Sequence, residues 1–78
     1  MFIVLEIQKN NGDLSILPFA FSDYKKARTK YYSTLAIASE TSLERHGAVL
    51  LTEGGSVIAK ESFFNAEVVE EVGEVENE

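Results

Sequence analysis

The sequence predicts a small α+β domain in which four strands and one helix follow the order β-β-α-β-β. Three observations lead to this prediction: apolar, β-branched runs of strand length, an Asn-Gly turn between the first two runs, and apolar residues at helical spacing in mid-chain. The simplest packing is a four-stranded, mainly antiparallel sheet with the helix on one face. We assign residues 1–64 to this single domain and residues 65–78 to an acidic C-terminal tail.

The first two strands are predicted to form a hairpin. Residues 2–8 are rich in β-branched and apolar side chains and have the length of a strand. Asn11-Gly12 is the strongest short hairpin signal, because both residues tolerate a positive φ. Residues 14–17 then return as the second strand. Pro18 has no N–H to donate, so it either ends this strand or places it at a sheet edge.

The helix is predicted over residues 23–40, because Ser22-Asp23 supplies an N-cap in front of a periodic apolar pattern. The residues that recur at spacings of three and four, and so share the buried face, are Tyr24, Ala27, Tyr31, Leu35 and Ala38. Tyr32 and Ile37 widen this apolar stripe around the side of the helix. An amphipathic helix of this kind is expected to cover one face of the sheet.

The second hairpin is predicted after the helix. Residues 41–47, which include the single histidine, His46, are expected to form a loop. The third strand follows over residues 48–52 and the fourth over residues 57–64, joined by a tight turn at two glycines. His46 is therefore expected at the surface, just before a strand.

Both faces of the first and third strands carry large apolar residues. A sheet with one face in water normally alternates apolar and polar side chains, so an apolar second face on so small a domain favours a partner. We therefore expect a homodimer or a higher homo-oligomer. The expected interface residues are Phe2, Val4, Tyr32, Ile37 and Leu50. Alternatively, short strands simply mix the residue types on their two faces.

The net negative charge comes from the end of the chain. Residues 1–64 hold seven acids and seven bases, whereas residues 65–78 hold six glutamates and no base and so supply the whole net charge of −6. A neutral body with an acidic end is typical of interaction proteins. The tail is predicted to be a flexible, solubilising segment. The alternatives are an extended strand in a groove, or a nucleic-acid mimic that occupies a basic partner.

The composition argues against several functions. Cysteine is absent and there is one histidine, so we expect no disulfide, no metal site and no catalytic triad. Without a catalytic constellation, we predict a protein that is not an enzyme and has no cofactor. A pI near 4.7 argues against direct nucleic-acid binding. No stretch approaches the ~18 apolar residues of a membrane span, and the N-terminus lacks a signal-peptide pattern, so we expect a cytoplasmic protein without a membrane partner.

The best candidate site is a basic cluster at the start of the predicted helix. It contains four of the seven bases, which are Lys25, Lys26, Arg28 and Lys30. Acids are normally favoured there because the helix dipole is positive at its N-terminus, so the cluster is repulsive unless an anion lies nearby. We expect these four residues and Tyr32 to bind the acidic tail, a phosphate-bearing ligand or an acidic protein surface. The alternative is a solvated helix face without a ligand.

A longer pattern runs through most of the chain. It comprises Phe2–Gln8 with the following turn, Leu14–Leu17, the helical pattern Asp23-Tyr24…Ala27…Lys30-Tyr31-Tyr32…Leu35-Ala36 and the segment His46–Gly55. Over residues 2–62 it resembles small uncharacterised proteins encoded by phages and prophages of Gram-positive bacteria. The resemblance implies a phage source and a place in the host cytoplasm, and it supplies no catalytic residue.

Two functions are compatible with this resemblance. In the first, the chain is a non-catalytic binding protein made during infection, an anti-defence inhibitor or sponge that occupies a host protein or an anionic nucleotide signal. In the second, it is an accessory protein of virion or tail assembly with an unknown role. The basic cluster is the site in the first reading and is incidental in the second, where the apolar sheet face matters.

Overall fold

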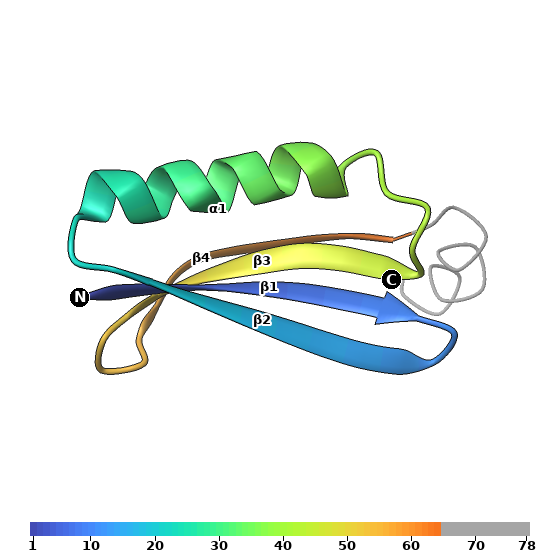
Figure 1. Ribbon diagram of the computed structural model, residues 1–78, viewed down its shortest axis with the longest axis horizontal. Helices are drawn as coiled ribbons and strands as arrows, with labels where there is room; N and C mark the ends of the chain where they lie inside the picture. Colours follow the sequence, from blue (N-terminus) through green and yellow to red (C-terminus); the bar gives the residue numbers. More distant parts are fainter. Residues whose placement is uncertain (65–78) are drawn as a thin grey trace, which may run out of the picture.

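The computed structural model describes residues 1–64, and they form the predicted α+β fold (Figure 1). The elements in chain order are β1 (Phe2–Asn10), β2 (Asp13–Phe21), α1 (Tyr24–Ala38), β3 (Arg45–Thr52) and β4 (Val57–Phe64). The four strands make one sheet in the order β2-β1-β3-β4, and all three neighbouring pairs are antiparallel. The predicted acidic tail, residues 65–78, lies outside the described residues.

The first hairpin has the turn that the sequence predicts. Asn11 and Gly12 take φ values of 55° and 83°, which suit the right-handed twist of the two strands. Both strands are longer than predicted, because pairing continues from Asn10–Asp13 at the turn to Phe2–Phe21 at the far end. Pro18 does not end β2; it lies opposite Leu5 in a strand at the sheet edge, where its missing N–H costs no sheet hydrogen bond.

The helix begins where the predicted N-cap lies. Asp23 has an extended backbone, and its carboxylate accepts a hydrogen bond of 2.9 Å from the backbone N–H of Lys25, which satisfies one of the free donors of the first turn. The helix ends at Ala38, two residues before the predicted end. There the backbone N–H of Glu40 donates to the carbonyl of Ile37, a tighter turn that is common at helix ends.

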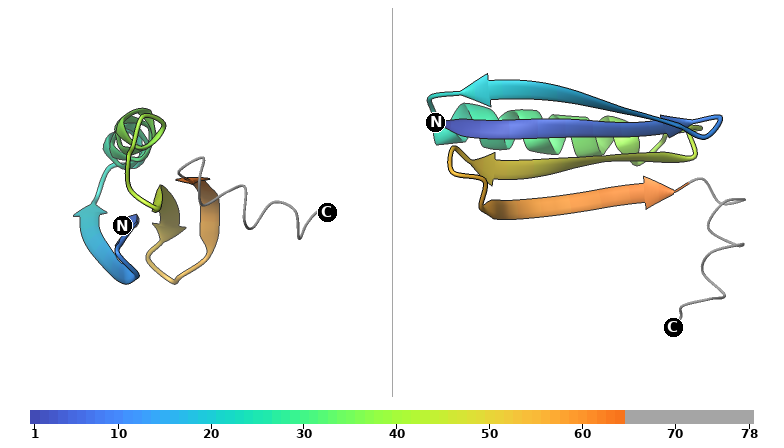
Figure 2. Two further views of the ribbon diagram at one scale, coloured as in Figure 1. Left: turned by 90° about the vertical axis from the view of Figure 1, so that its right-hand side faces the viewer. Right: turned by 90° about the horizontal axis from the view of Figure 1, so that it is seen from below.

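The helix packs mainly on β3 and β1, and the core lies between them (Figures 1 and 2). The buried apolar residues of this layer are Val4, Ala27, Tyr31, Ala48 and Leu50. Small side chains on both elements, such as Ala27 and Ala48, let the helix approach the sheet closely. The partly buried Phe2, Phe19, Phe21, Leu35 and Ala59 complete the packing around this cluster.

This packing corrects part of the predicted interface. Val4 and Leu50 are the largest fully buried side chains of the described chain, so they belong to the core beneath α1 and are not available to a partner. Phe2 packs against the same core and lies edge-on to the ring of Tyr24, at 5.2 Å between centroids. The sequence predicted two equally apolar faces and so did not identify the one that the helix covers.

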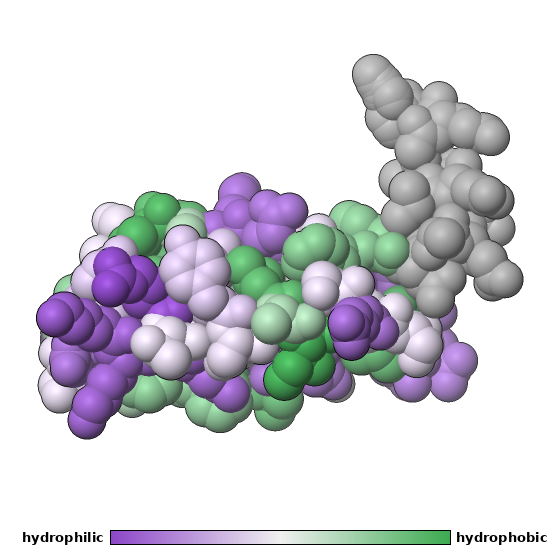
Figure 3. Space-filling view, turned by 90° about the horizontal axis from the view of Figure 1, so that it is seen from above, coloured by the Kyte–Doolittle hydropathy of each residue, from purple (hydrophilic) through white to green (hydrophobic). Residues whose placement is uncertain are grey.

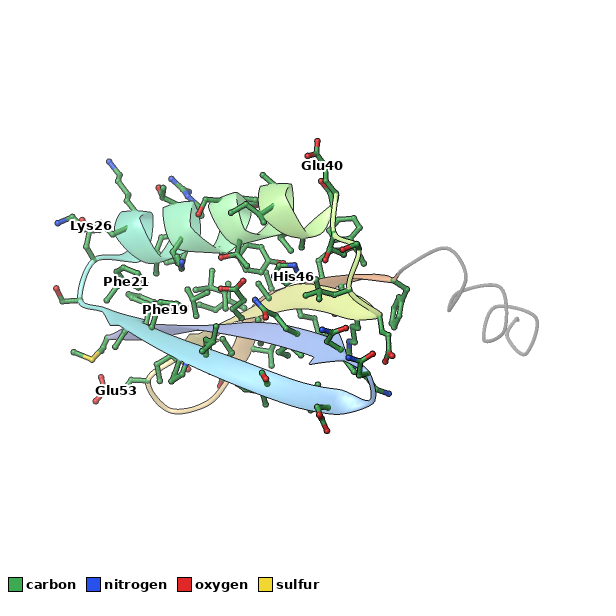
Figure 4. The ribbon with its side chains drawn as sticks, turned by 45° about the vertical axis from the view of Figure 1, so that its right-hand side comes forward. Phe19, Phe21, Lys26, Glu40, His46 and Glu53 are labelled. Carbon is green, nitrogen blue, oxygen red and sulfur yellow. The ribbon has the colours of Figure 1, made fainter. Side chains whose placement is uncertain are left out.

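The third strand begins three residues earlier than predicted. Because β1 extends to Asn10, β3 pairs with it from Arg45 onwards, and the predicted loop over residues 41–47 is shorter. His46 is therefore a strand residue whose side chain points toward the helix, and the prediction of a surface loop position is wrong (Figure 4). β4 follows with the predicted bounds and a register shift between Leu50 and Leu51.

Candidate functional site

The start of α1 borders a shallow depression lined on several sides by lysines. It has a volume of about 440 Å³, is open to solvent and is lined by Phe21, Lys25, Lys26, Thr29, Lys30 and Ser33. These side chains offer three ammonium groups, two hydroxyl groups and one aromatic ring. Hydrophilic side chains gather at the end of the molecule where α1 begins, as the space-filling view shows (Figure 3).

The helix geometry explains why these residues come together. Lys26 and Lys30 are four positions apart and so lie on the same side of the helix, the side that faces the edge strand β2. The ammonium of Lys30 lies 4.0 Å from the centroid of the Phe19 ring on β2, a distance at which a cation is attracted to the ring face. Phe21, from the end of β2, supplies the apolar part of the lining. Figure 4 shows Lys26 pointing outward from the first turn.

Two residues of the predicted anion site lie elsewhere. Arg28 and Tyr32 do not line the depression. The guanidinium carbon of Arg28 lies 5.4 Å from the centroid of the Tyr24 ring, and Tyr32 lies edge-on to Tyr31 at 5.2 Å. The cause is helical periodicity: Arg28 is two residues from both Lys26 and Lys30, about 200° around the helix axis. The predicted cluster is therefore split between two sides of α1.

No lysine of the depression forms an ion pair among residues 1–64, although Lys30 lies near enough to Glu6 to help lower the pKa of that carboxyl. In this part of the chain the N-terminal ammonium pairs with Glu53 at 3.2 Å, and the imidazole of His46 lies 2.7 Å from the carboxylate of Glu6. The nearest acid in sequence, Asp23, uses one carboxylate oxygen to cap the helix. The first turn contains no acid. The depression is therefore a concentration of positive charge that an anion would neutralise.

A second polar group lies in the core under the helix and was missed by sequence reasoning. Nε2 of His46, on β3, lies 2.7 Å from Oε2 of Glu6, on β1, and the amide of Gln8 donates to the same oxygen at 3.0 Å. The side chains of His46 and Glu6 are 6% and 14% exposed. A buried ionisable group needs such partners, because burial without them is costly. The sequence does contain a sign of this polar group: Glu6 and Gln8 stand at alternate positions of an otherwise apolar strand and so share one face.

The surroundings of Glu6 change its acidity. Burial raises the pKa of this carboxyl, but the hydrogen bonds from His46 and Gln8, together with the positive charges of His46 and Lys30, outweigh burial and hold the pKa below its ordinary value of 4.5. Hydrogen bonds to a carboxylate favour its charged form. The charged form of Glu6 is therefore more stable in the folded chain than in the unfolded chain.

This lowered pKa predicts a loss of stability in acid. The contribution of Glu6 is fully present above the unfolded pKa near 4.5 and is lost as the pH falls through the lower folded pKa. Urea unfolding of the wild type and of Glu6→Gln, measured at intervals from pH 7 to pH 3, should show a constant difference down to about pH 4.5 that then shrinks. A difference that stays constant down to pH 3 would contradict the ionised, hydrogen-bonded state of Glu6.

The Glu6–His46 pair has poor access for catalysis. A general base must lie within hydrogen-bond reach of the proton that it removes, yet Nε2 of His46 is already paired with Glu6, and the pair lines neither the depression at α1 nor the one between β3 and β4. Nδ1 of His46 and Oγ1 of Thr34 are buried without a hydrogen-bond partner among residues 1–64. The geometry makes the pair a link between β1 and β3 beneath the helix.

The second depression lies between β3 and β4 and was not predicted. Its volume is about 400 Å³, and its lining residues are Arg45, Val49, Lys60, Glu61, Ser62 and Phe64. Ser62 lies opposite Gly47, which has no side chain to fill this part of the sheet. Nε and Nη2 of Arg45 both donate to Oγ of Ser62 at 3.4 Å, and the guanidinium lies 5.6 Å from the Phe64 ring centroid. In the sequence, the only sign of this depression is the glycine at position 47, within the third strand.

Taken together, the fold and the depressions define a small α+β protein with a helix-covered face, a bare sheet face and a basic hollow at the start of its helix. Comparison with known proteins finds no match to any family model, any curated protein or any solved structure. Within residues 1–64 no helix has the length and apolar character needed to cross a membrane. The same residues contain no group of three or more His, Cys, Asp or Glu side chains placed to hold a metal ion.

Proposed function

We propose that this chain is a non-catalytic binding protein that recognises an anionic, phosphate-bearing small molecule in the depression at the start of α1. The observation that carries the proposal is the set of three ammonium groups, Lys25, Lys26 and Lys30, around one hollow, none of which forms an ion pair among residues 1–64. Lysine is a common phosphate ligand that acts as a point charge. The hydroxyls of Thr29 and Ser33 add donors beside these charges.

The aromatic and apolar lining supports a ligand that is more than a free phosphate ion. Phe21 forms part of the hollow, and the neighbouring Phe19 already holds the ammonium of Lys30 over its ring. A flat organic group could stack on such a ring, while the phosphate stays with the lysines. The volume of about 440 Å³ is in the usual range of small-molecule sites. A nucleotide combines these two chemical features.

The resemblance to phage and prophage proteins gives this proposal its biological setting. In that setting the protein acts in the host cytoplasm as an anti-defence inhibitor or sponge, and it occupies an anionic nucleotide signal or a host protein. Binding without catalysis is sufficient for such a role. The buried Glu6–His46 pair, with its poor access to a substrate, is in keeping with a protein that only binds.

Thermal unfolding in the presence of nucleotides tests the proposal. We expect a cyclic or linear adenine or guanine nucleotide at about 100 times its Kd to raise the Tm of the full chain by roughly 10 °C. Lys26→Glu should abolish the rise, because it reverses a charge in the depression. Arg28→Glu is the matched control: it makes the same charge change on the other side of α1 and should keep the rise.

Several outcomes would refute this function. An unchanged Tm with every nucleotide and with inorganic phosphate would exclude a small-molecule ligand. Stabilisation by polyglutamate alone would instead indicate an acidic protein surface as the partner. Equal loss of the Tm rise in Lys26→Glu and Arg28→Glu would show that the depression is not the site. Raising the salt concentration should weaken binding to the wild type, since the lysines are exposed.

An accessory role in virion or tail assembly is the second candidate function. The observation that favours it is the bare face of the sheet, where apolar side chains such as Leu14, Ile16 and Val57 are exposed. Exposed apolar patches are typical of protein interfaces. Detection of the protein in purified particles, combined with unchanged melting across the nucleotides, would support this second function over the first.

A further inference from the structure

The face of the sheet that points away from α1 is apolar and carries bases but no acids. We call it the open face, and its strand residues within 1–64 are Ile3, Leu5, Ile7, Lys9, Leu14, Ile16, Pro18, Ala20, Arg45, Gly47, Val49, Leu51, Val57, Lys60, Ser62 and Phe64. No described element covers this face, as the view from below shows (Figure 2). The prediction of an apolar second face therefore holds, although different residues form it.

The helix-covered core is thin for a domain that leaves its other face bare. Within residues 1–64, only two large side chains, Val4 and Leu50, are fully buried in it. A body of this size buries only about 60% of the surface that its unfolded chain exposes, so small domains commonly gain stability from a partner. The open face offers such a partner exposed apolar side chains that include Leu14, Ile16 and Val57.

We propose that a second copy of this chain covers the open face. The two sheets then pack face to face as a sandwich about 10 Å thick, related by a two-fold axis. This proposal does not depend on the nucleotide site, because Lys26 and its neighbours lie on the opposite side of the sheet. It gives the predicted homodimer a definite interface made of residues such as Leu5, Ile16 and Val49.

The positions of the charges select one of the two possible two-fold arrangements. Lys9 and Arg45 are cross-strand partners at one end of the open face. Glu53 follows β3 at the opposite end, where its Oε1 pairs with the N-terminal ammonium at 3.2 Å while the side chain stays 75% exposed. A two-fold axis parallel to the strands would place Lys9 and Arg45 of one copy opposite the same two residues of the other. An axis across the strands instead places Lys9 and Arg45 of one copy near Glu53 of the other, which is the favourable arrangement.

The area of the open face suits a reversible dimer. Strands of eight or nine residues, at ~3.3 Å per residue and ~4.8 Å between strands, give a face of roughly 500 Å² per copy. Two copies then bury about 1,000 Å², which is near the lower limit for specific interfaces. We therefore expect dissociation at low concentration and dimers at tens of micromolar.

Sedimentation velocity of the full chain tests the dimer. We expect twice the 8.6 kDa mass at about 100 µM and a shift toward the single-chain mass on dilution. Ile16→Lys should abolish the dimer, whereas Ile37→Lys, on the helix, should keep it; these residues are 51% and 67% exposed, so both variants should fold. A wild type that stays monomeric at about 200 µM, or equal effects of the two variants, would overturn the proposal.

Charge reversal tests the arrangement of the two copies. Arg45→Glu should weaken the dimer about tenfold, because it places two acids together at each end of the interface. The double variant Arg45→Glu/Glu53→Lys should recover most of the affinity. If the double variant is no better than Arg45→Glu alone, the axis across the strands is wrong.

Deletion of residues 65–78 distinguishes a second copy of the chain from the other possible occupants of the open face. Dimers with unchanged affinity after the deletion support the open face as the contact between copies. A monomeric full chain that dimerises only after the deletion would show that residues 65–78 occupy the face, which overturns the proposal. A chain that is monomeric in both forms leaves the face to a different protein, and this result overturns it as well.

Discussion

Glu6→Ala is expected to lower the free energy of unfolding by about 2–4 kcal/mol, because it removes the carboxylate that His46 and Gln8 share and leaves the buried imidazole without a hydrogen-bond partner. Nε2 of His46 would lose the oxygen that now lies 2.7 Å away, and the amide of Gln8 would lose its acceptor. The imidazole of His46 would stay buried under the helix, whereas the partly buried amide of Gln8 could turn to water. Urea unfolding at pH 7, followed by circular dichroism, measures this loss.

Two further variants separate the pair from simple packing. Gln8→Ala removes only the second donor to the same oxygen and should cost about 1 kcal/mol. The double variant Glu6→Leu/His46→Phe replaces both polar groups by apolar ones and should recover much of the loss, since replacing both partners of a hydrogen bond by apolar groups can be nearly neutral. A loss below about 1 kcal/mol in Glu6→Ala would mean that the pair contributes little to the fold.

The sequence was sufficient to predict the order of the elements and the antiparallel sheet, because each element carries a local signal. The N-cap at Asp23 and the positive φ of Asn11 and Gly12 act within a few residues. Such short-range preferences do not depend on the rest of the fold. The apolar stripe of the helix was predicted in large part: Ala27, Tyr31 and Ala38 are buried and Leu35 is partly buried. Tyr24, in the first turn, is instead 38% exposed.

The start of β3 could not be predicted, because pairing with β1 determines it. Residues 45–47 lack strand propensity, but β1 extends to Asn10 and so offers hydrogen-bond partners as far as Arg45. This long-range pairing moves His46 from a predicted loop into the core. The polar residue Glu6, opposite Ala48 on the same face, explains why a histidine can be buried there.

Local sequence patterns also could not predict which face of the sheet the helix covers. Val4 and Leu50 are similar in character to Leu5 and Val49, so hydrophobicity alone does not distinguish the faces. The helix covers the face that carries Val4, Ala48 and Leu50, and small side chains such as Ala27 and Ala48 let the two layers pack closely there. This choice buried two residues of the predicted interface and left Tyr32 and Ile37 exposed on α1, away from the open face.

Only part of the candidate site could be predicted from the sequence, because helical periodicity separates residues that are close along the chain. The four bases are close in sequence, but a helix turns about 100° per residue, so closeness in sequence does not give a common face. Lys26 and Lys30 meet at the depression, whereas Arg28 stacks near Tyr24 on the other side. The contribution of Phe21 depends on where β2 ends in space, which no pattern in the helix contains.

Gly47→Ala is the second change for which we expect a large loss of stability, about 1–3 kcal/mol or more. A β-carbon at this position would collide with the carbonyl oxygen of Glu61 and Oγ of Ser62, and it would lie 2.7 Å from Cα of Ser62. Two of these atoms belong to the backbone of β4 and cannot move without breaking the pairing of the two strands. Thermal or urea unfolding measures the loss.

A matched glycine in the same hairpin shows whether the loss comes from this close approach. A β-carbon added at Gly54 would meet no atom within 4 Å other than those of its chain neighbours, so Gly54→Ala should change the stability by less than about 0.5 kcal/mol. Adding Ser62→Gly to Gly47→Ala removes the hydroxyl contact but not the backbone contacts, so we expect only partial recovery. Full recovery would mean that the serine side chain, and not the spacing of β3 and β4, requires a glycine here.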